Sequence, residues 1–470
     1  MESTTVPLTK RIIGLALAAV FIVGSCLIPG SEAISHQGIM ALGLLLALAS
    51  MWATSALPIG AIALFVVIML PLLGIVDSVS QAFSGFAGSP LFFIIAVFSL
   101  PVIMGKTKWG VRLMAKLLNW TGSDSRKLVL GFMIATTLVS TVMSDVPTTV
   151  LFLGFALTIL KAAGAEPGKS NLGKDLMIAV PVAAVTGGVA TPAGSSFNVV
   201  AMQILQQTTG QTISFFDWMI VGLPIAIIMT PICWFFITKI IKPEPITDAC
   251  LQGIRDEAAA STKVSAYDVK ALLMIVLLVV LWILGNWIPV LNVTVVALVG
   301  LTVMFLPGID LLTWGEFQKS VPWGIVLMCG TIFTIGGVVQ ATGGAEFLAN
   351  LFMGSGVTSL GFFASIAILM ALVYILHTIC PIGAAILAIF IPIFITLCAG
   401  FGVSAAVPTI SLAIVVAGNV LLPVNPTVML TYGEGYYTFG DMFKTGIVPA
   451  VVLIALITFW VPIIVGVMGI

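Results

Sequence analysis

Every basic side chain of this 470-residue sequence can be placed on one side of a membrane, and this constrains the fold more than any other feature. The 18 Lys and Arg residues lie before the first apolar segment or in every second loop after it. The sequence is 60% hydrophobic, with a mean hydropathy of +1.23. Because no soluble core of this length could bury so much apolar surface, we expect an all-α integral membrane protein surrounded by the lipid bilayer. The positive-inside rule then places the N-terminus in the cytoplasm and the C-terminus outside, in the plasma (inner) membrane.

Composition and motifs exclude several other classes of protein. The formal net charge is zero, so no nucleic acid partner is indicated. The six Cys residues show no CxxC spacing, which argues against a metal centre, and we expect no cofactor apart from a coupling ion. No GxxxxGK[ST] motif is present, which argues against an ATP-driven pump. Trp109, Trp218, Trp287 and Trp323 lie near the ends of apolar segments and are expected to anchor them at the membrane interface.

The first interruption in the pattern lies within the apolar residues 128–160, whose centre at 140–149 is rich in Ser, Thr and Asp. Basic residues flank both ends, so the segment crosses the membrane twice or not at all. Two full crossings need about 40 residues plus a turn, which is more than the stretch offers. We therefore expect a re-entrant hairpin that enters from the cytoplasm, with its polar tip facing protein or a water-filled cavity.

The next apolar segment, 175–206, is too long for one simple crossing and contains several Gly and polar residues at 186–198. This pattern predicts two half-helices joined by an unwound loop. A span at 217–240 and a hydrophilic cytoplasmic segment at 242–266 follow. The composition of that segment is typical of a linker between two halves.

The second half of the chain repeats this order. Residues 359–398 form another interrupted apolar segment, but no Lys or Arg flanks it, so this hairpin enters from outside. A long span at 404–431, broken at 418–427, matches the earlier broken span. A hairpin followed by a broken helix thus occurs twice in opposite orientations. Such an inverted repeat is typical of secondary transporters, which bind their substrate near the membrane midplane.

Five stretches of sequence carry a resemblance to a known family. They are 198–210, 213–224, 312–314, 320–324 and 433–442. Taken together, they resemble the divalent-anion/sodium symporters, which carry di- and tricarboxylates and sulfate. The resemblance covers nearly the whole chain. It implies a homodimer with a scaffold domain at the interface, and a transport domain that contains both hairpins and moves like an elevator.

The resemblance, combined with the apolar pattern, predicts about 11 transmembrane helices plus two re-entrant hairpins. Five segments are expected: scaffold helices 1–4 in 1–126; the first hairpin, broken helix 5 and helix 6 in 127–241; a cytoplasmic linker in 242–268; scaffold helices 7–9 in 269–357; and the second hairpin, broken helix 10 and helix 11 in 358–470.

The hairpin tips depart from the family pattern. The family carries Ser-Asn-Thr at both tips, where these residues help to hold sodium and substrate. Here the first tip reads Ser144-Asp145-Val146 and the second reads Thr378-Ile379-Cys380, so both Asn residues are absent. This departure leaves sodium coupling, proton coupling and substrate exchange open.

No basic residue lies in the middle of a span, so an anion site would use backbone N–H groups, hydroxyls and amides. The expected substrate-binding residues are Ser144, Thr148, Thr149, Ser195, Ser196, Asn198, Pro381, Asn425, Pro426 and Thr427. The candidates for holding a coupling ion, Na⁺ or H⁺, are Asp145, Gly194, Thr378 and His377. The alternative for each single Ser or Thr is a hydrogen bond to its own helix.

Asp145 is the most informative single residue, because a carboxylate at membrane depth is costly and indicates a function. It could bind a cation, carry a proton or simply cap a half-helix. His377 could titrate near neutral pH, or it could be an ordinary packing residue.

We expect a transporter of C4 or C5 dicarboxylates rather than an enzyme. Citrate, sulfate and an ion antiporter of the same general fold remain alternatives. A channel and an intramembrane hydrolase that uses a Ser with His377 are weaker ones, since neither explains the doubled hairpins.

Overall fold

The computed structural model describes residues 7–109, 112, 116, 120–122, 124–246, 264–354, 356–379, 383–423 and 425–470. Within these residues the regular structure is helical, apart from one isolated bridge between Ser31 and Ile34. Eight helices of the described chain are long and apolar enough to cross a membrane, and six shorter apolar helices accompany them. The expected all-α class is therefore confirmed for this part of the chain.

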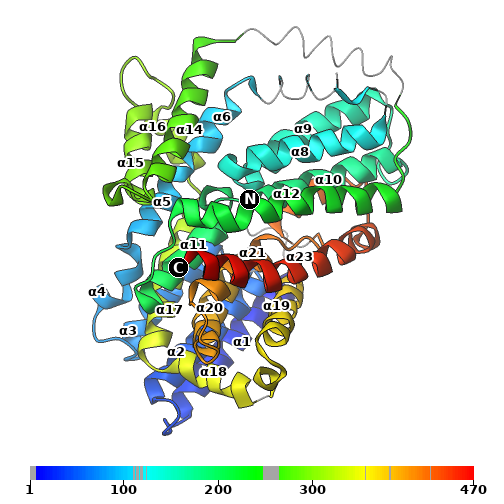
Figure 1. The fold of residues 1–470 in the computed structure, drawn as a ribbon. Coiled ribbons are helices and arrows are strands. Elements are labelled where there is room, and N and C mark those ends of the chain that lie inside the picture. The colour runs from blue at the N-terminus through cyan, green and yellow to red at the C-terminus, as the bar shows by residue number, and fades with distance from the viewer. Residues whose placement is uncertain are drawn as a thin grey trace.

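The helices of the first half show where the apolar pattern is continuous and where it breaks (Figure 1). They are α1 (Leu8–Leu27), α2 (His36–Ala53), α3 (Ile59–Leu72), α4 (Val79–Ala82), α5 (Ser89–Val97), α6 (Ser99–Gly105), α8 (Ser125–Met143), α9 (Asp145–Ala162), α10 (Asn171–Gly188), α11 (Ser196–Thr209) and α12 (Phe215–Ile240).

The helices of the second half follow the same order of continuous and broken elements. They are α14 (Ala266–Leu284), α15 (Val293–Met304), α16 (Trp314–Ser320), α17 (Trp323–Ala341), α18 (Gly344–Gly354), α19 (Phe362–Ile379), α20 (Gly383–Ala399), α21 (Ala406–Ala417), α22 (Pro426–Tyr432) and α23 (Phe439–Met468).

Capping boxes fix the starts of four helices that follow polar loops. In each, a Ser or Thr side chain accepts from the backbone N–H three residues on, and the acidic side chain there accepts from the backbone N–H of the cap. The pairs are Ser214 with Asp217 at α12, Ser265 with Asp268 at α14, Thr313 with Glu316 at α16, and Thr438 with Asp441 at α23. Both α12 and α23, the helices that follow the two broken segments, begin in this way.

The first hairpin consists of α8 and α9, joined by Ser144 alone. α8 begins before the apolar stretch 128–160 and α9 ends after it, so these helices have 19 and 18 residues. Each is long enough to cross a membrane. The apolar stretch therefore underestimates the length of this hairpin. The tip of the hairpin nevertheless meets the break between α10 and α11, and its re-entrant character stays a prediction.

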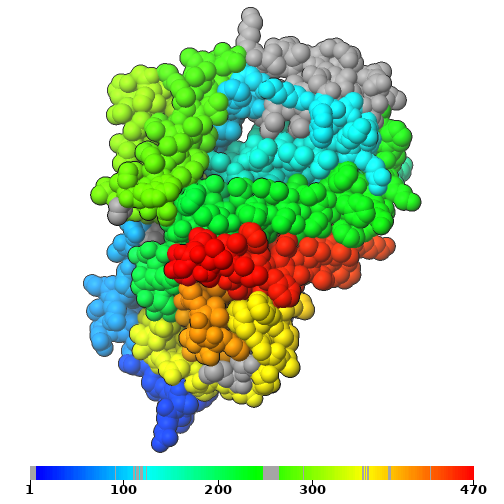
Figure 2. All heavy atoms as spheres, in the orientation of Figure 1, coloured from blue at the N-terminus to red at the C-terminus, as the bar shows by residue number. Residues whose placement is uncertain are grey.

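Helices α8, α9, α10 and α12 pack along one another, and α23 lies beside α12 (Figures 1 and 2). Large apolar side chains remain exposed on the outer helices, for example Val20 on α1 (64% exposed) and Val467 on α23 (80% exposed). Exposed apolar surface on this scale is stable in lipid rather than in water.

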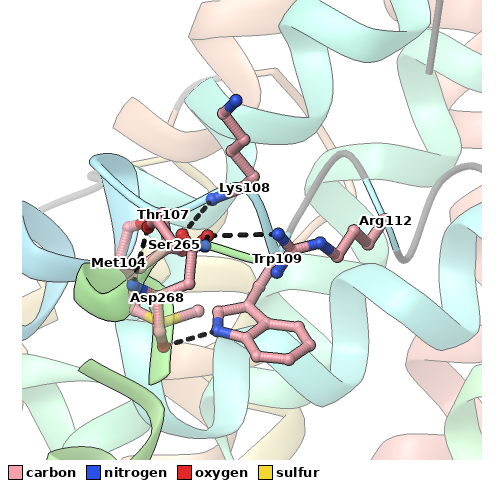
Figure 3. A network of polar contacts seen from close by, with 7 residues as sticks. All are labelled: Met104, Thr107, Lys108, Trp109, Arg112, Ser265 and Asp268. Atoms are coloured by element: carbon pink, nitrogen blue, oxygen red, sulfur yellow. Dashed lines mark hydrogen bonds and ion pairs between the residues drawn. The ribbon is translucent and has the colours of Figure 1, made fainter. Parts of the chain in front are cut away.

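A buried polar junction ties the segment after α6 to the start of α14 (Figure 3). The Asp268 carboxylate accepts from the backbone N–H of Lys108 at 2.9 Å and from the Arg112 guanidinium at 3.1 Å. The indole N–H of Trp109 donates to the backbone carbonyl of Asp268. Because Asp268 is only 1% exposed, the carboxylate requires these donors to remain buried.

Candidate functional site

The turn of the first hairpin presents a carboxylate at the start of a helix. Ser144 adopts a left-handed backbone with φ of +70°, which a non-glycine residue seldom does, and α9 begins immediately after it. The Asp145 carboxylate accepts from the backbone N–H of Val146 at 2.9 Å and from the Ser144 hydroxyl at 3.2 Å. The backbone therefore turns sharply at the point where the helix dipole and a charged side chain meet.

The break between α10 and α11, residues 189–195, contains a short 3-10 helix at Pro192–Gly194, and side chains hold it in place. The amide nitrogen of Asn198 donates to the carbonyl oxygens of Gly188 and Thr191, both at 2.8 Å. The Thr191 hydroxyl donates to the Thr141 carbonyl and so links the break to the first hairpin. The amide oxygen of Asn198 is buried and has no hydrogen-bond partner within the described chain. This oxygen is free to accept a hydrogen bond or to bind a cation.

Two glycines allow the backbone on either side of this break to approach closely. A Cβ added at Gly194 would lie 2.6 Å from the carbonyl oxygen of Gly188, a distance that real Cβ atoms do not show. A Cβ at Gly188 would also lie 3.6 Å from the Cβ of Asp145. Gly194 thus has a steric role at the break, next to the hairpin tip.

The second break, between α21 and α22, is organised by two asparagines. Asn425 caps α22, accepting from the backbone N–H of Thr427 at 2.8 Å, and its amide donates to the carbonyl of Asn419 at 3.1 Å. The Asn419 amide donates to the carbonyl of Tyr374 at 2.8 Å and to the Thr378 hydroxyl at 2.9 Å. Thr378, at the end of α19, is therefore tied to the break that follows the second hairpin.

Two contacts join the halves of the chain at these breaks. The Thr427 hydroxyl lies 3.4 Å from the Asp145 carboxylate, close enough for a weak hydrogen bond. The His377 ring, 2% exposed, packs edge-on against Phe197 with centroids 6.2 Å apart. Its Nδ1 atom is buried without a partner among the described residues. Pro381 lies outside the described residues.

Ser144, Ser195 and Ser196 line one small cleft, together with Pro192, Val199 and side chains of α5 and α6. The free volume of the cleft is about 30 Å³, which is room for water rather than for an organic anion. Phe93, Phe98 and Pro101 form the opposite wall.

Other expected site residues lie elsewhere. The Thr148 hydroxyl donates to the Ser144 carbonyl at 2.6 Å, so it fulfils the local alternative. Thr149 is fully buried and its hydroxyl has no partner within the described chain. Pro426 is the first residue of α22, where proline is favoured. None of these three residues lines the cleft.

Two residues that contact or form the breaks were not among the expected site residues. Asn419 occupies the second break much as Asn198 occupies the first, and the symmetry of the repeats is the signal that could have identified it. Trp218 was expected to lie at the interface, but it is fully buried and its indole N–H donates to the Val189 carbonyl at 3.1 Å. That expectation is wrong, because an unwound carbonyl at the first break needs a donor.

Comparison with known proteins places the chain in a family. Residues 9–467 match the family described as "Sodium:sulfate symporter transmembrane region". Similar proteins include two named sodium-dependent dicarboxylate transporter SdcS. That of Staphylococcus saprophyticus is 24% identical over 487 residues, covering 97% of this chain and 92% of the relative. That of Staphylococcus aureus is 25% identical over 493 residues, covering 98% and 93%.

A solved structure shares the fold. The crystal structure of the Alcanivorax borkumensis YdaH transporter superimposes with a TM-score of 0.55 at 15% identity, covering 92% of this chain and 98% of that one. The apolar helices and the family match agree that the protein is integral to a membrane. The chain is therefore a membrane transporter and not an enzyme, and it belongs to the sodium:sulfate symporter family.

Proposed function

We propose that the chain is a secondary active transporter of divalent organic anions, with C4 and C5 dicarboxylates as its substrates. The observation that carries this proposal is the cleft at which Ser144, Ser195 and Ser196 meet. The starts of α9 and α11 adjoin it, and helix starts attract anions without the help of Lys or Arg. The names of the SdcS relatives favour carboxylates over sulfate.

The substrate contacts follow from this placement. We assign the hydroxyls of Ser144, Ser195 and Ser196 to the substrate carboxylates. The second break would supply the remaining contacts, because Thr427 reaches the first hairpin through Asp145. The other proposed substrate residues are Thr149, Asn198, Pro381, Asn425 and Pro426, whereas the Thr148 hydroxyl is already bonded to the Ser144 carbonyl.

Asp145 is the proposed coupling residue. Two unit charges about 5 Å apart repel by about 3 kcal/mol at an effective dielectric constant of 20, so a dianion cannot easily sit beside a bare carboxylate. A Na⁺ ion or a proton on Asp145 would remove this repulsion. The unpartnered amide oxygen of Asn198 and the backbone at Gly194 lie at the adjoining break and suit a cation. Thr378 and His377 are secondary candidates in the second half.

Uptake of labelled succinate into proteoliposomes tests the function. Vesicles are loaded with unlabelled succinate or with buffer, and uptake is measured across sodium and pH gradients. Uptake into buffer-loaded vesicles driven by either gradient supports a symporter. Uptake only into preloaded vesicles, indifferent to both gradients, identifies an exchanger. No movement of succinate in any arm contradicts the dicarboxylate proposal.

The coupling role of Asp145 has its own test. Asp145→Asn removes the charge but keeps the size, so we expect the sodium or pH dependence of uptake to change more than the preference among dicarboxylates. Asp77→Asn is the matched control, because Asp77 is exposed and distant from both breaks in the sequence. Unchanged sodium and pH profiles in Asp145→Asn would defeat the coupling role.

The hydroxyls are tested by Ser195→Ala combined with Ser196→Ala. Each lost donor is worth on the order of 1 kcal/mol, so the two together should weaken succinate binding by roughly tenfold to thirtyfold. An unaltered concentration for half-maximal uptake would remove this break from the substrate site.

The finer architecture follows from the family resemblance. We propose a homodimer in the plasma membrane, with a scaffold formed by 1–126 and 269–357. The transport domain would comprise 127–241 and 358–470 and move like an elevator, with 242–268 as the linker. Light scattering of the detergent-solubilised protein measures the oligomeric state, and a monomeric mass contradicts the dimer.

An ion antiporter of the same general fold is the second candidate. The Asp145 carboxylate favours it, since an acid within the membrane can exchange cations for protons. Succinate-independent dissipation of a pH gradient by added sodium would support this candidate. A screen that includes citrate and sulfate covers the remaining anions.

A further inference from the structure

A buried carboxyl group at one end of α10 takes no part in the site described above. Asp175 lies just inside the start of this helix, and its side chain is 0% exposed. Neither of its two carboxyl oxygens has a hydrogen-bond partner within the described chain. Because the side chain is completely buried, water cannot supply the missing donors.

This environment disfavours a charge on Asp175. An ionised carboxylate accepts hydrogen bonds at both oxygens, and burying one without donors costs far more free energy than taking up a proton. Asp268 shows the contrast, because it is 1% exposed but accepts from two backbone N–H groups and from Arg112. No donor of this kind reaches Asp175 within the described chain.

The basic residues around this end of α10 are engaged elsewhere or exposed. The Arg126 guanidinium on α8 donates to the Thr238 carbonyl at 3.3 Å and not to Asp175. Lys174, the preceding residue, pairs with Asp441 at 3.5 Å. Among the helices that pack against α10, α22 carries no charged residue. The other lysines on these helices are exposed, and they are Lys127 on α8, Lys161 on α9 and Lys239 on α12.

The segment that follows α12 is attached to the same end of α10. The Glu244 carboxylate accepts from the backbone N–H groups of Asn171 at 2.7 Å and of Leu172. The Glu244 backbone carbonyl accepts from the Ser125 hydroxyl at the start of α8. Residues 242–246 are therefore held across the starts of two helices.

Glu244 and Asp175 act on one another through charge. Burial raises the pKa of Glu244, but the hydrogen bonds from the backbone N–H groups of Asn171 and Leu172 outweigh it, so the pKa lies below its usual value of 4.5. Asp175 follows Leu172 by three residues, which places both on the same side of the helix. The charge of Glu244 opposes ionisation of Asp175, and that of Arg126 favours it. The buried acid is thus the one of the two that takes up a proton.

The neighbouring loops identify the side of the membrane. The loop before α10 and the segment at the end of α12 are rich in lysine. By the positive-inside rule, this end of α10 faces the cytoplasm.

We propose that Asp175 is a proton-binding site at the cytoplasmic end of α10, and that release of its proton weakens the attachment of residues 242–246 to α8 and α10. The structure then represents the protonated form, in which Glu244 carries the only negative charge of the pair. A rise in cytoplasmic pH adds a second negative charge beside Glu244 and loosens the attachment. This inference concerns a site other than Asp145 and does not depend on the substrate.

Difference infrared spectroscopy of the purified protein tests whether the proton is present. At about pH 6, an aspartate with its ordinary pKa of about 3.9 is ionised and gives no band from a protonated carboxyl group. The spectrum of wild type minus Asp175→Asn should contain such a band. Asp77→Asn, at an exposed position, is the matched control and should give none. Absence of the band for Asp175 would overturn the proposal.

The pH dependence of melting gives a second readout. An acid that holds its proton more tightly in the folded chain adds stability that is complete below about pH 3.9 and is lost as the pH rises and the folded protein releases the proton. The melting temperature of the wild type should therefore fall relative to that of Asp175→Asn between about pH 6 and about pH 9. A difference that stays constant with pH would contradict the proton site. Asp175→Leu, which also lacks a charge, repeats both measurements if Asp175→Asn does not fold.

Glu244→Gln tests the attachment through a double-mutant cycle with Asp175→Asn. At about pH 9, Glu244→Gln should lower the melting temperature less in the wild type than in Asp175→Asn, because only the wild type then loses a repulsion between two charges. At about pH 6 the two losses should be equal, since Asp175 is neutral. Equal losses at both pH values would overturn the link between the proton and the attachment. No measurement here uses succinate, so failure of succinate transport would contradict the proposed function and leave this inference standing.

Discussion

Replacing Asp268 by alanine should destabilise the protein more than any replacement of an exposed acid, because Asp268 holds the junction between α6 and α14 (Figure 3). Its carboxylate accepts from two backbone N–H groups, those of Lys108 and Ser265, both at 2.9 Å. It also pairs with Arg112, whose side chain is 10% exposed. Alanine leaves all three donors without this acceptor.

The size of the effect follows from burial. Breaking a buried ion pair by removing one partner costs about 3–5 kcal/mol, whereas an exposed pair is worth about 0–1 kcal/mol. Arg112→Met should cost less than Asp268→Ala, since the carboxylate keeps both backbone donors. A hydrogen bond to a charged group is worth about 1.5–3 kcal/mol, and that sets the expected loss for Arg112→Met.

The assay is the apparent melting temperature of the purified protein in detergent, followed by tryptophan fluorescence at one scan rate, because unfolding of such proteins is commonly irreversible. Asp77→Ala is the matched control, since Asp77 is exposed. We expect melting temperatures to fall in the order Asp77→Ala, Arg112→Met, Asp268→Ala. The reasoning would be refuted if Asp268→Ala had the same melting temperature as the control. It would also be refuted if only Arg112→Met melted below the control.

Two further predictions concern the first break and a surface ion pair. Gly194→Ala should abolish succinate uptake in folded protein, because the added Cβ would clash with the Gly188 carbonyl oxygen. Gly154→Ala, which has open space around it, should transport normally. Equal uptake by both variants would contradict the close approach. The hydrogen bond from Lys106 lowers the pKa of the Glu316 carboxyl group from 4.5 to about 2. The ionised Glu316 side chain therefore contributes its full stability above about pH 4.5, and this contribution is lost as pH falls through about 2. Glu316→Gln should thus lower the melting temperature at about pH 7 and differ little from wild type near pH 2; a pH-independent difference would exclude the ion pair.

The positions of the helices and breaks could be predicted from the sequence because their signals are local. An apolar run flanked by basic residues predicts a span or a hairpin, and clustered Gly and polar residues predict an unwound loop. The structure accordingly ends α10 at Gly188 and α21 at Ala417, within the regions where breaks were expected. The length of the first hairpin was underestimated, because its arms continue through polar residues that the apolar pattern excludes.

The contacts within the site could not be predicted, because they join residues far apart in sequence. Thr427 meets Asp145 across 282 residues, and Trp218 donates to a carbonyl 29 residues away. Thr148 shows the opposite case. Its type and position suggested a substrate contact, but its hydroxyl bonds within its own helix. Hydroxyl position within an apolar segment does not reveal which way the side chain points.

Counterflow of succinate tests the central claim, transport of dicarboxylates through the serine-lined cleft, whichever ion is coupled to transport. Vesicles containing wild-type protein are loaded with unlabelled succinate and diluted into a trace of labelled succinate. The proposal predicts transient accumulation of label, and a higher succinate requirement for Ser195→Ala combined with Ser196→Ala. Label that never exceeds the level in protein-free vesicles, with folded protein confirmed in the same membranes, would contradict it.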